Sequence, residues 1–344
     1  MQQLNERQQK ILGFLSEKGS ASSSQITAFL DNDISRFTVL RDLDGLLKDK
    51  RIKKTGKGRS VKYEFFLPNR LLSYINPDEY FKKGPDERRV LPFDAEIFDY
   101  LLELFSSEEI DDLNRINSIY IEKLGRMSDA GLKKEIERLT IELSWKSSRM
   151  EGNTYSLIDT EMLIKERIEA KGHKKEETIM ILNHKNAIDY IFNNKNDFKE
   201  LSLFQIEKVH ELLTRGLNID SAIRSESVGI TGTRYRPIND KIKIIGFLNK
   251  TIDAVNSSKN PFAKALIVIL MISYLQPFSD GNKRTARILA NAVLLANNAC
   301  PLSYRNIDEA DYKKATLLFY EQNNARFLKE LFMDQFKFAV DNYF

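Results

Sequence analysis

The chain has 344 residues, of which 42% are hydrophobic and 30% charged, a composition typical of a globular protein with two or three domains. No stretch reaches the ~18–20 uninterrupted apolar residues of a membrane helix, because the best candidate, residues 265–275, is short and leads into a polar motif. The polar N-terminus lacks the apolar stretch of a secretory signal. Cys300 is the only cysteine, which excludes an intramolecular disulfide and argues against a Cys/His zinc site. We therefore expect a cytoplasmic protein without a membrane partner, in which Cys300 is a buried core residue.

The net charge of +4 is concentrated at the N-terminus. Residues 1–66 hold 13 Lys and Arg against 8 Asp and Glu, so the remaining 278 residues are nearly neutral. Any basic surface is therefore expected in the N-terminal part.

Three amphipathic helices and a β-hairpin are predicted at the N-terminus. The helices are expected over residues 7–19, 24–30 and 36–50, and the strand-like runs of 51–66 flank a TGKG turn. This order resembles a winged helix-turn-helix domain, which we assign to residues 1–68. The apolar face of the third helix is predicted to consist of Phe37, Leu40, Leu43, Leu46 and Leu47.

The predicted hairpin is strongly basic. Residues 50–62 contain seven cations and no acid, a pattern typical of phosphate contact: Lys50, Arg51, Lys53, Lys54, Lys57, Arg59 and Lys62. On the third helix, Arg36, Thr38 and Arg41 are expected to face outward, as in a recognition helix. The sequence thus predicts duplex DNA as a partner. The acidic residues of the same helix leave open the alternative of a domain used for dimerisation or protein contact.

Residues 69–92 are predicted to be a linker, since four of the eight prolines lie in 67–92. From residue 93 to 344 the periodicity is almost entirely helical. One strand-like interruption, residues 226–238, has β-branched residues on either side of Gly232 and predicts a hairpin. The expected fold class is mainly α, a helical bundle with one β-hairpin, preceded by the small N-terminal domain.

The segment 275–287, LQPFSDGNKRTAR, contains the residues expected to bind a charged ligand. A turn rich in Gly, Asn and Asp opens a helix at Lys283, so backbone N–H groups and the positive end of the helix dipole meet at one point. Arg284 and Arg287 share one helix face and add two guanidinium groups, which suit a polyphosphate. Asp280 at the mouth can supply an oxygen ligand to Mg²⁺.

This segment resembles the Fic signature H-P-F-x-D-G-N-G/K-R-x-x-R, which here spans residues 276–287 with Gln276 in the place of the histidine. The resemblance covers roughly residues 90–340. SSRMEGN, residues 147–153, resembles the inhibitory motif S/T-x-x-x-E-G/N of regulated Fic proteins, with Ser147, Glu151 and Gly152 in the matching places. The predicted hairpin resembles the family's flap, with Val228, Gly229, Ile230 and Thr231 on its first arm.

The resemblance implies a protein adenylyltransferase that transfers AMP from ATP to a hydroxyl of a protein target. Asp280 would hold Mg²⁺, and Gly281, Asn282 and Lys283 would form the anion nest. Arg284 would contact the phosphates. Arg287 would bind the γ-phosphate and, at rest, pair with Glu151. The flap would hold the target by strand addition, and Phe278 would anchor the loop in the core.

Two positions depart from the family pattern. Lys283 replaces a glycine, as in Doc-like members, whereas Arg287 retains the γ-phosphate contact of the AMP-transferring type. Gln276 has no usable pKa near 7 and cannot act as general base, a loss of about 10²–10⁴-fold. The three histidines offer no replacement, since His210 is expected to be a packed helix residue and His173 and His184 to be solvent or packing residues. Trp145 is expected to pack in the core beside the inhibitory segment.

Two functions therefore remain open from the sequence. The first is an adenylyltransferase that is autoinhibited by Glu151 and impaired or inactivated by Gln276. The second is a catalytically inactive, nucleotide-sensing regulator that binds DNA through its N-terminal domain. A homodimer is compatible with either.

Overall fold

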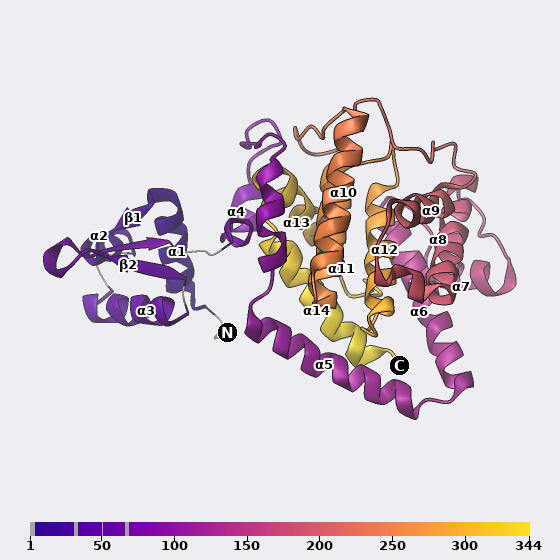
Figure 1. Ribbon diagram of the computed structural model, residues 1–344, viewed down its shortest axis with the longest axis horizontal. Coiled ribbons are helices and arrows are strands. Elements are labelled where there is room, and N and C mark those ends of the chain that lie inside the picture. Colours follow the sequence, from indigo (N-terminus) through magenta and orange to yellow (C-terminus); the bar gives the residue numbers. More distant parts are fainter. Residues whose placement is uncertain (1–3, 31–33, 50, 66–68) are drawn as a thin grey trace. The chain divides into compact units, whose positions relative to one another are not determined.

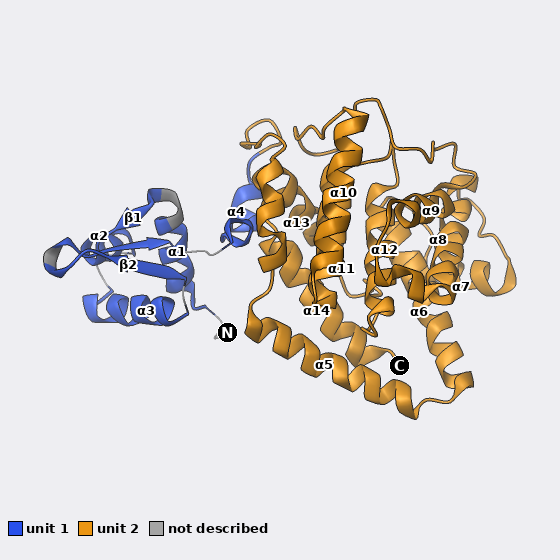
Figure 2. Cartoon of the chain, in the orientation of Figure 1, with its two compact units in different colours: residues 1–83 blue, residues 84–344 orange. Residues whose placement is uncertain are grey.

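A computed structural model describes residues 4–30, 34–49, 51–65 and 69–344. The chain forms two compact units, residues 1–83 and 84–344 (Figure 2). The division falls inside the segment that the sequence predicts as a linker. In the described part of that segment, a 3₁₀ turn η2 (Arg70–Leu72) and a short helix α4 (Pro77–Phe81) belong to the first unit.

The first unit combines three helices with a small antiparallel sheet. The elements run α1 (Glu6–Lys18), β1 (Ser20–Ala21), α2 (Ser23–Leu30), α3 (Arg36–Lys48), β2 (Ile52–Thr55) and β3 (Lys62–Phe65) (Figure 1). The strand order is β1-β3-β2, and Lys53 is opposite Glu64. The predicted helices and hairpin strands are all present among the described residues, while the two-residue β1 was not predicted. Whether this unit functions as a winged helix stays a prediction.

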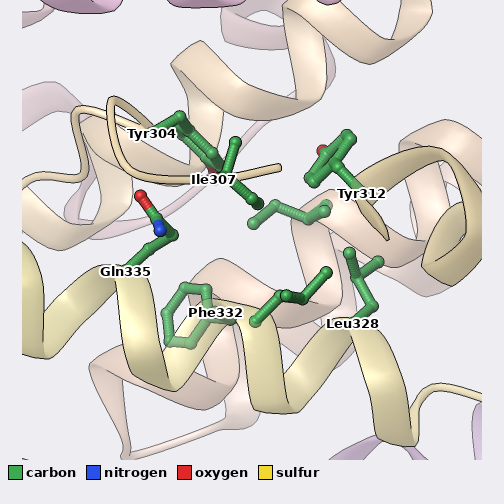
Figure 3. Close-up of a pocket in the computed structure, with 8 residues that line it drawn as sticks. Tyr304, Ile307, Tyr312, Leu328, Phe332 and Gln335 are labelled. Atoms are coloured by element: carbon green, nitrogen blue, oxygen red, sulfur yellow. The ribbon is translucent and has the colours of Figure 1, made fainter. Parts of the chain in front are cut away.

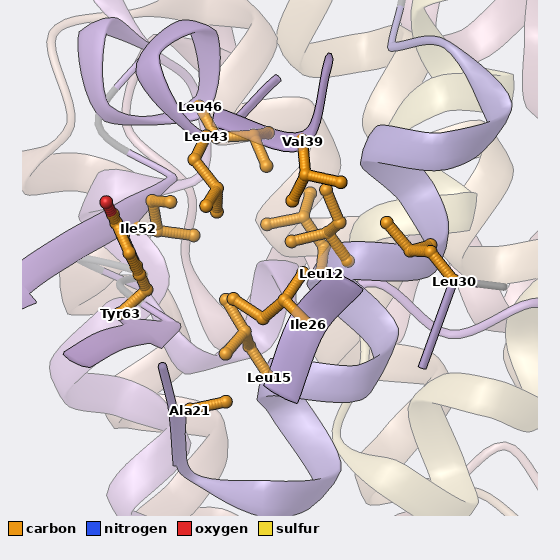
Figure 4. Close-up of a cluster of buried hydrophobic side chains, with 11 residues drawn as sticks. Leu12, Leu15, Ala21, Ile26, Leu30, Val39, Leu43, Leu46, Ile52 and Tyr63 are labelled. Atoms are coloured by element: carbon orange, nitrogen blue, oxygen red, sulfur yellow. The ribbon is translucent and has the colours of Figure 1, made fainter. Parts of the chain in front are cut away.

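The core of the first unit is one apolar cluster that the helices and the sheet share (Figure 4). It includes Leu12, Leu15, Ile26, Leu43 and Ile52, which are at most 2% exposed. Capping supports the local structure: Asn5 closes the start of α1 with a reciprocal capping box, and Ser35 caps α3.

The predicted apolar face of α3 is wrong in its first half. Phe37 is 78% exposed and Leu40 37%, whereas Val39 and Asp42 are buried. The buried stripe follows i, i+3, i+4 and i+7 through Val39, Asp42, Leu43 and Leu46, the periodicity of a helix face. Asp42 can be buried because Arg7 of α1 donates to it at 2.8 Å.

The second unit is a bundle of helices. The long ones are α5 (Ser107–Arg126), α6 (Asp129–Arg149), α8 (Lys175–Asn193), α10 (Lys241–Ser257) and α14 (Arg326–Asn342). The shorter ones are α7 (Leu157–Glu166), α9 (Leu203–Thr214), α11 (Pro261–Leu275), α12 (Asn282–Ala296) and α13 (Glu309–Gln322), with 3₁₀ segments η3 (Ala95–Glu103) and η4 (Lys195–Lys199).

Helices α11 and α12 form the centre of this unit (Figure 1). From Phe262 to Ala296, nearly every residue of the two helices is buried. Helices α8, α9, α10 and α13 pack around the pair. Cys300, just after α12, is fully buried, as predicted. Among the described residues, no helix is long and apolar enough to cross a membrane.

Candidate active site

The turn between α11 and α12 is held by its own side chains. Asn282 accepts from the N–H of Phe278 through Oδ1 (2.9 Å) and donates to its carbonyl through Nδ2 (2.8 Å). Phe278 is fully buried and stacks on His210 of α9, with ring centroids 3.6 Å apart. Gly281 has φ of +81°, and a Cβ there would lie 3.2 Å from Thr214. The turn is therefore rigid, with Phe278 as the predicted anchor, and the Asn282 side chain is committed to the turn.

Gln276 ends α11 and is enclosed by protein groups. It has a left-handed backbone, φ of +47°, and is 9% exposed. Its Oε1 accepts from Asn282 Nδ2 at 3.0 Å, and its Nε2 donates to the Ser273 carbonyl at 2.7 Å and to the Tyr320 hydroxyl at 3.4 Å. An amide in these bonds can still accept a hydrogen bond, but it has no usable pKa for removing a proton.

Two buried arginines line the same site. Arg284 is 2% exposed and Arg287 is fully buried. One terminal nitrogen of each, Nη1, has no hydrogen-bond partner in the described structure. Burial lowers the pKa of the Arg284 guanidinium, and the Asp280 carboxylate, 3.5 Å from it, opposes this shift. Two unsatisfied buried cationic N–H groups are costly in a protein interior, and an anion with several oxygens would satisfy them.

Glu151, just past the end of α6, pairs with two cations of the motif 276–287. Its Oε1 lies 2.8 Å from Arg287 Nη2, and its Oε2 lies 2.8 Å from Lys283 Nζ. Burial acts to raise the pKa of this carboxyl, but the Arg287 and Lys283 charges outweigh it and hold the pKa below its ordinary value. The carboxylate is therefore charged at neutral pH and bridges two cations of the motif 276–287.

Ser147 and Gly152, two further residues of the segment SSRMEGN, support this contact. Ser147 accepts from Arg287 Nε through its hydroxyl and from Nη2 through its carbonyl, both at 3.0 Å. Gly152 has φ of +94°, which favours glycine where the chain turns back after α6. The resemblance implied that Glu151 pairs with Arg287, and the structure brings the two together. The contact of Ser147 with Arg287 was not predicted. The contact of Glu151 with Lys283 was not predicted, because spacing alone cannot show which cation a carboxylate reaches.

Helix α6 is fixed to the bundle by further polar contacts. The Ser147 hydroxyl is 2.9 Å from His184 Nε2 on α8, and His184 Nδ1 is 2.9 Å from the Met180 carbonyl. Burial, together with the Arg284 charge, lowers the pKa of His184 to about 3, so the ring is neutral. Lys146 and Arg149 also form ion pairs with Glu309 of α13, both at 3.0 Å. These contacts fix the end of α6 and therefore the position of the Glu151 carboxylate that follows it.

His210 and His184 are packed inside the bundle, and His173 is half-buried. The Nε2 atom of His210 is 2.9 Å from the Asp280 carbonyl, and burial lowers the pKa of His210 to about 4. The ring of His173 packs against that of Tyr155 at a tilt of 45°, and its Nδ1 lies 2.8 Å from the Thr154 hydroxyl. Trp145 is half-buried and donates to the Tyr155 carbonyl, so it packs beside the segment 147–153 but is not a full core residue.

Asp280 lies at the mouth of the site. Its side chain is 70% exposed, and Oδ1 accepts from the N–H of Gly281. No group of three or more His, Cys, Asp or Glu residues with the geometry of a metal site occurs among the described residues. One accessible carboxylate fits a Mg²⁺ ion that takes its other oxygens from substrate phosphates and water, as this ion usually does.

A small apolar cavity lies beside Tyr312 of α13 (Figure 3). It is lined by side chains of α13, α14 and the segment before them, including Tyr304, Ile307, Tyr312, Leu328, Phe332 and Gln335. Tyr312 links it to the site, because Arg287 lies 5.7 Å from the ring centre of Tyr312. This contact was not predicted from the sequence. The cavity has no cation among its lining residues and does not suit a nucleotide.

Residues 200–294, which contain the motif and the helices that hold it, match the model of the Fic/DOC family. This segment is a Fic/DOC domain. The match does not reach Glu151 or the rest of the segment 147–153.

Curated relatives of the chain are named protein adenylyltransferases. That of Culex quinquefasciatus is 27% identical over 176 residues, 48% of this chain and 34% of the relative. A probable protein adenylyltransferase of Aquifex aeolicus is 31% identical over 106 residues, 28% of this chain and 31% of the relative. The chain thus spans about a third of the length of these relatives.

Solved structures show the fold of the Fic domain. Fic-1 of Caenorhabditis elegans (residues 134–508) aligns over 99% of both chains with a TM-score of 0.60 and 14% identity. A Fic-domain signalling protein of Bacteroides thetaiotaomicron aligns over 67% of this chain and 92% of its own, with a TM-score of 0.53 and 19% identity.

The β-hairpin that the sequence predicts beside the Fic motif is not formed. Residues 221–240 contain no strand and only a turn at 231–232. Pro237 has no N–H for a ladder, and Gly229 and Gly232 carry no side chain to pack in a strand, so pairing across the loop is weak. Val228 and Ile230 are half-buried, while Gly229 and Thr231 are exposed. The first arm of the loop thus alternates between half-buried and exposed residues, as an extended strand does, but it has no partner strand.

Proposed function

We propose that the chain is a Fic-type protein adenylyltransferase, which transfers AMP from ATP to a hydroxyl of a protein, and that Glu151 inhibits it. The observation that carries the proposal is the Glu151 carboxylate, 2.8 Å from each of two motif cations, Arg287 and Lys283. A carboxylate held between these cations would take the position that a terminal phosphate of ATP needs. The relatives named adenylyltransferases support the same reaction class.

Different residues of the motif 276–287 would have different roles in this reaction. Arg284 and Arg287 would pair with phosphate oxygens through their unpartnered Nη1 atoms, and the N–H groups at the start of α12 would complete the anion nest. Asp280 would hold Mg²⁺, which when bound neutralises phosphate charge and favours departure of pyrophosphate. Gln276 stands where the family carries its base, so deprotonation of the acceptor hydroxyl would be slow.

Calorimetric titration with ATP and Mg²⁺ tests the site. Arg287→Ala should weaken binding about 10–100-fold, because charge-assisted hydrogen bonds to phosphate are removed. Glu151→Gly should strengthen binding, since it removes the competing carboxylate. Arg115→Ala on α5, which is 71% exposed and paired with Asp112, is the matched control and should leave the affinity unchanged. No detectable binding even by Glu151→Gly would refute a polyphosphate site.

A second candidate function is a regulator that senses nucleotide through the Fic domain and binds DNA with its N-terminal unit. It is favoured by the enclosure of Gln276, which leaves no base, and by the basic surface of residues 51–65. In that region Lys53, Lys54 and Lys57 are exposed, as are Arg36 and Arg41 on α3. Lys53 is partly neutralised by Glu64 at 2.9 Å. Lys50 lies outside the described residues, and so does the side chain of Arg59.

Substitution of the exposed lysines tests DNA binding. In the full-length chain, Lys54→Ala with Lys57→Ala should weaken binding to genomic duplex fragments and lower the slope of log affinity against log salt by about 2, because two phosphates are no longer neutralised. Lys10→Ala on α1, where Lys10 pairs with Glu6, is the control. If the starting protein shows no salt-sensitive DNA binding, the regulator is excluded. If it labels proteins from labelled ATP, the enzyme is supported.

A further inference from the structure

Arg224 is buried at the base of the loop 226–238. It is 3% exposed, and its guanidinium donates to carbonyls at both ends of the loop. Nη1 reaches the Glu226 carbonyl at 2.7 Å, and Nη2 reaches the Ile238 carbonyl at 2.5 Å. The two ends of a loop that has no strand pairing are therefore joined through one side chain.

The same guanidinium caps the C-terminus of α11 by donating to its carbonyl groups. Nε donates to the Gln276 carbonyl at 2.6 Å and Nη2 to the Leu275 carbonyl at 3.3 Å, while the Arg224 N–H donates to the Pro277 carbonyl at 3.0 Å. These carbonyls belong to the last turn of a helix and to the residues after it, where intrahelical partners are missing and a cation is favourable. The bond to Gln276 also supports the left-handed backbone of that residue, a costly conformation for a residue other than glycine.

A second arginine holds the tip of the loop. Arg88 Nη2 donates to the Gly232 carbonyl at 2.5 Å, and Arg234 Nη2 donates back to the Arg88 carbonyl at 2.7 Å. Between the two anchors, the backbone of residues 227–231 makes no backbone–backbone hydrogen bond with any described residue. This stretch of main chain is thus fixed at both sides and has free hydrogen-bonding groups between them.

We propose that Arg224 is a positioning residue that couples the loop 226–238 to the turn carrying residue 276. An extended acceptor segment of a target protein, added along residues 227–231, would thereby be held at a fixed distance from the reacting site. The role rests on the proposed adenylyl transfer, because it concerns where the acceptor hydroxyl is placed. Arg224 would thus affect where the acceptor hydroxyl is placed, and it would not affect the binding of ATP.

Mobility of the two segments in the full-length chain tests the coupling directly. In Arg224→Met, tryptic cleavage after Arg234, next to the buried Tyr235, and hydrogen exchange of the last amides of α11 should both become about tenfold faster. Arg224→Lys, which keeps the charge but not the fork of donors, should show a smaller change in both. Arg215→Lys is the control, since Arg215 is exposed and pairs with Glu211. A response of one segment without the other, or of neither, would overturn the coupling.

The acceptor used by the enzyme separates positioning from stability. With Glu151→Gly and Gln276→His as background, labelled ATP can give AMP to proteins of a cell lysate or to water. In the second case water oxygen bonds to the α-phosphorus, the bond to the bridging oxygen breaks, and pyrophosphate leaves. Arg224→Lys should lower the ratio of protein labelling to AMP release about tenfold, whereas a loss of stability lowers both equally and would contradict a positioning role. If the background labels no protein, adenylyl transfer fails as a function, and the mobility result alone decides the coupling.

Discussion

Replacing Glu151 by Gly and Gln276 by His together should raise AMP transfer well above the sum of the two single effects. Glu151 pairs with Arg287 and Lys283, so we expect ATP to bind in an unproductive way unless this carboxylate is removed. Gln276 lacks a proton-accepting group, and a restored general base is worth about 10²–10⁴-fold. Each change corrects a defect that the other leaves, which is why their effects should not be additive.

The measurement is transfer of labelled AMP to the protein itself or to lysate proteins by the starting chain, both single variants and the double variant. Glu151→Gly alone should bind ATP more tightly but transfer slowly. Gln276→His alone should stay inhibited. Glu151→Gly with Gln276→Ala is the matched control and should transfer no faster than Glu151→Gly. A starting protein as fast as the double variant would show that Gln276 is no defect.

Replacing Glu321 by Ala should destabilise the second unit by about 3–5 kcal/mol, because it leaves a buried guanidinium without its carboxylate. Arg88 is 5% exposed and Glu321 is 0% exposed. Their contact is bidentate, with Nε to Oε2 at 2.9 Å and Nη2 to Oε1 at 3.0 Å. Arg88 also holds the tip of the loop 226–238, so the same change should loosen that loop.

Urea unfolding followed by the fluorescence of Trp145, the single tryptophan, reports on this unit. Glu330→Ala is the control, since Glu330 is half-exposed and its pair with Arg326 should contribute ~0–1 kcal/mol. Replacement of both partners, Arg88→Met with Glu321→Leu, should recover much of the loss, as apolar residues remove the unpaired charge. Equal stability of Glu321→Ala and Glu330→Ala would argue against a buried ion pair of this strength.

Local signals in the sequence predicted most of the helices and the motif at the end of α11. The turn 276–281 is specified by residues close to one another in the chain, such as Asn282 and Gly281, so its form could be anticipated. The meeting of Glu151 with Arg287 could be anticipated only through the resemblance, since 136 positions separate the two residues.

The errors occurred where distant contacts decide the local structure. The face of α3 is set by the bond between Asp42 and Arg7, 35 residues away, which pulls a charged residue inward and leaves Phe37 outside. The loop 226–238 has β-branched residues typical of strands, but its ends are joined by Arg224 instead of a ladder. The pairing of Lys283 with Glu151 depends likewise on how α6 packs against α12.

The structure of the Glu151→Gly variant with ATP and Mg²⁺ bound tests the proposed inhibition by Glu151 most directly. We expect terminal phosphate oxygens within hydrogen-bonding distance of Arg287 and Lys283, in the place that the Glu151 carboxylate occupies here. Arg287 and Lys283 without phosphate contacts, or a nucleotide bound away from residues 276–287, would contradict this inhibition.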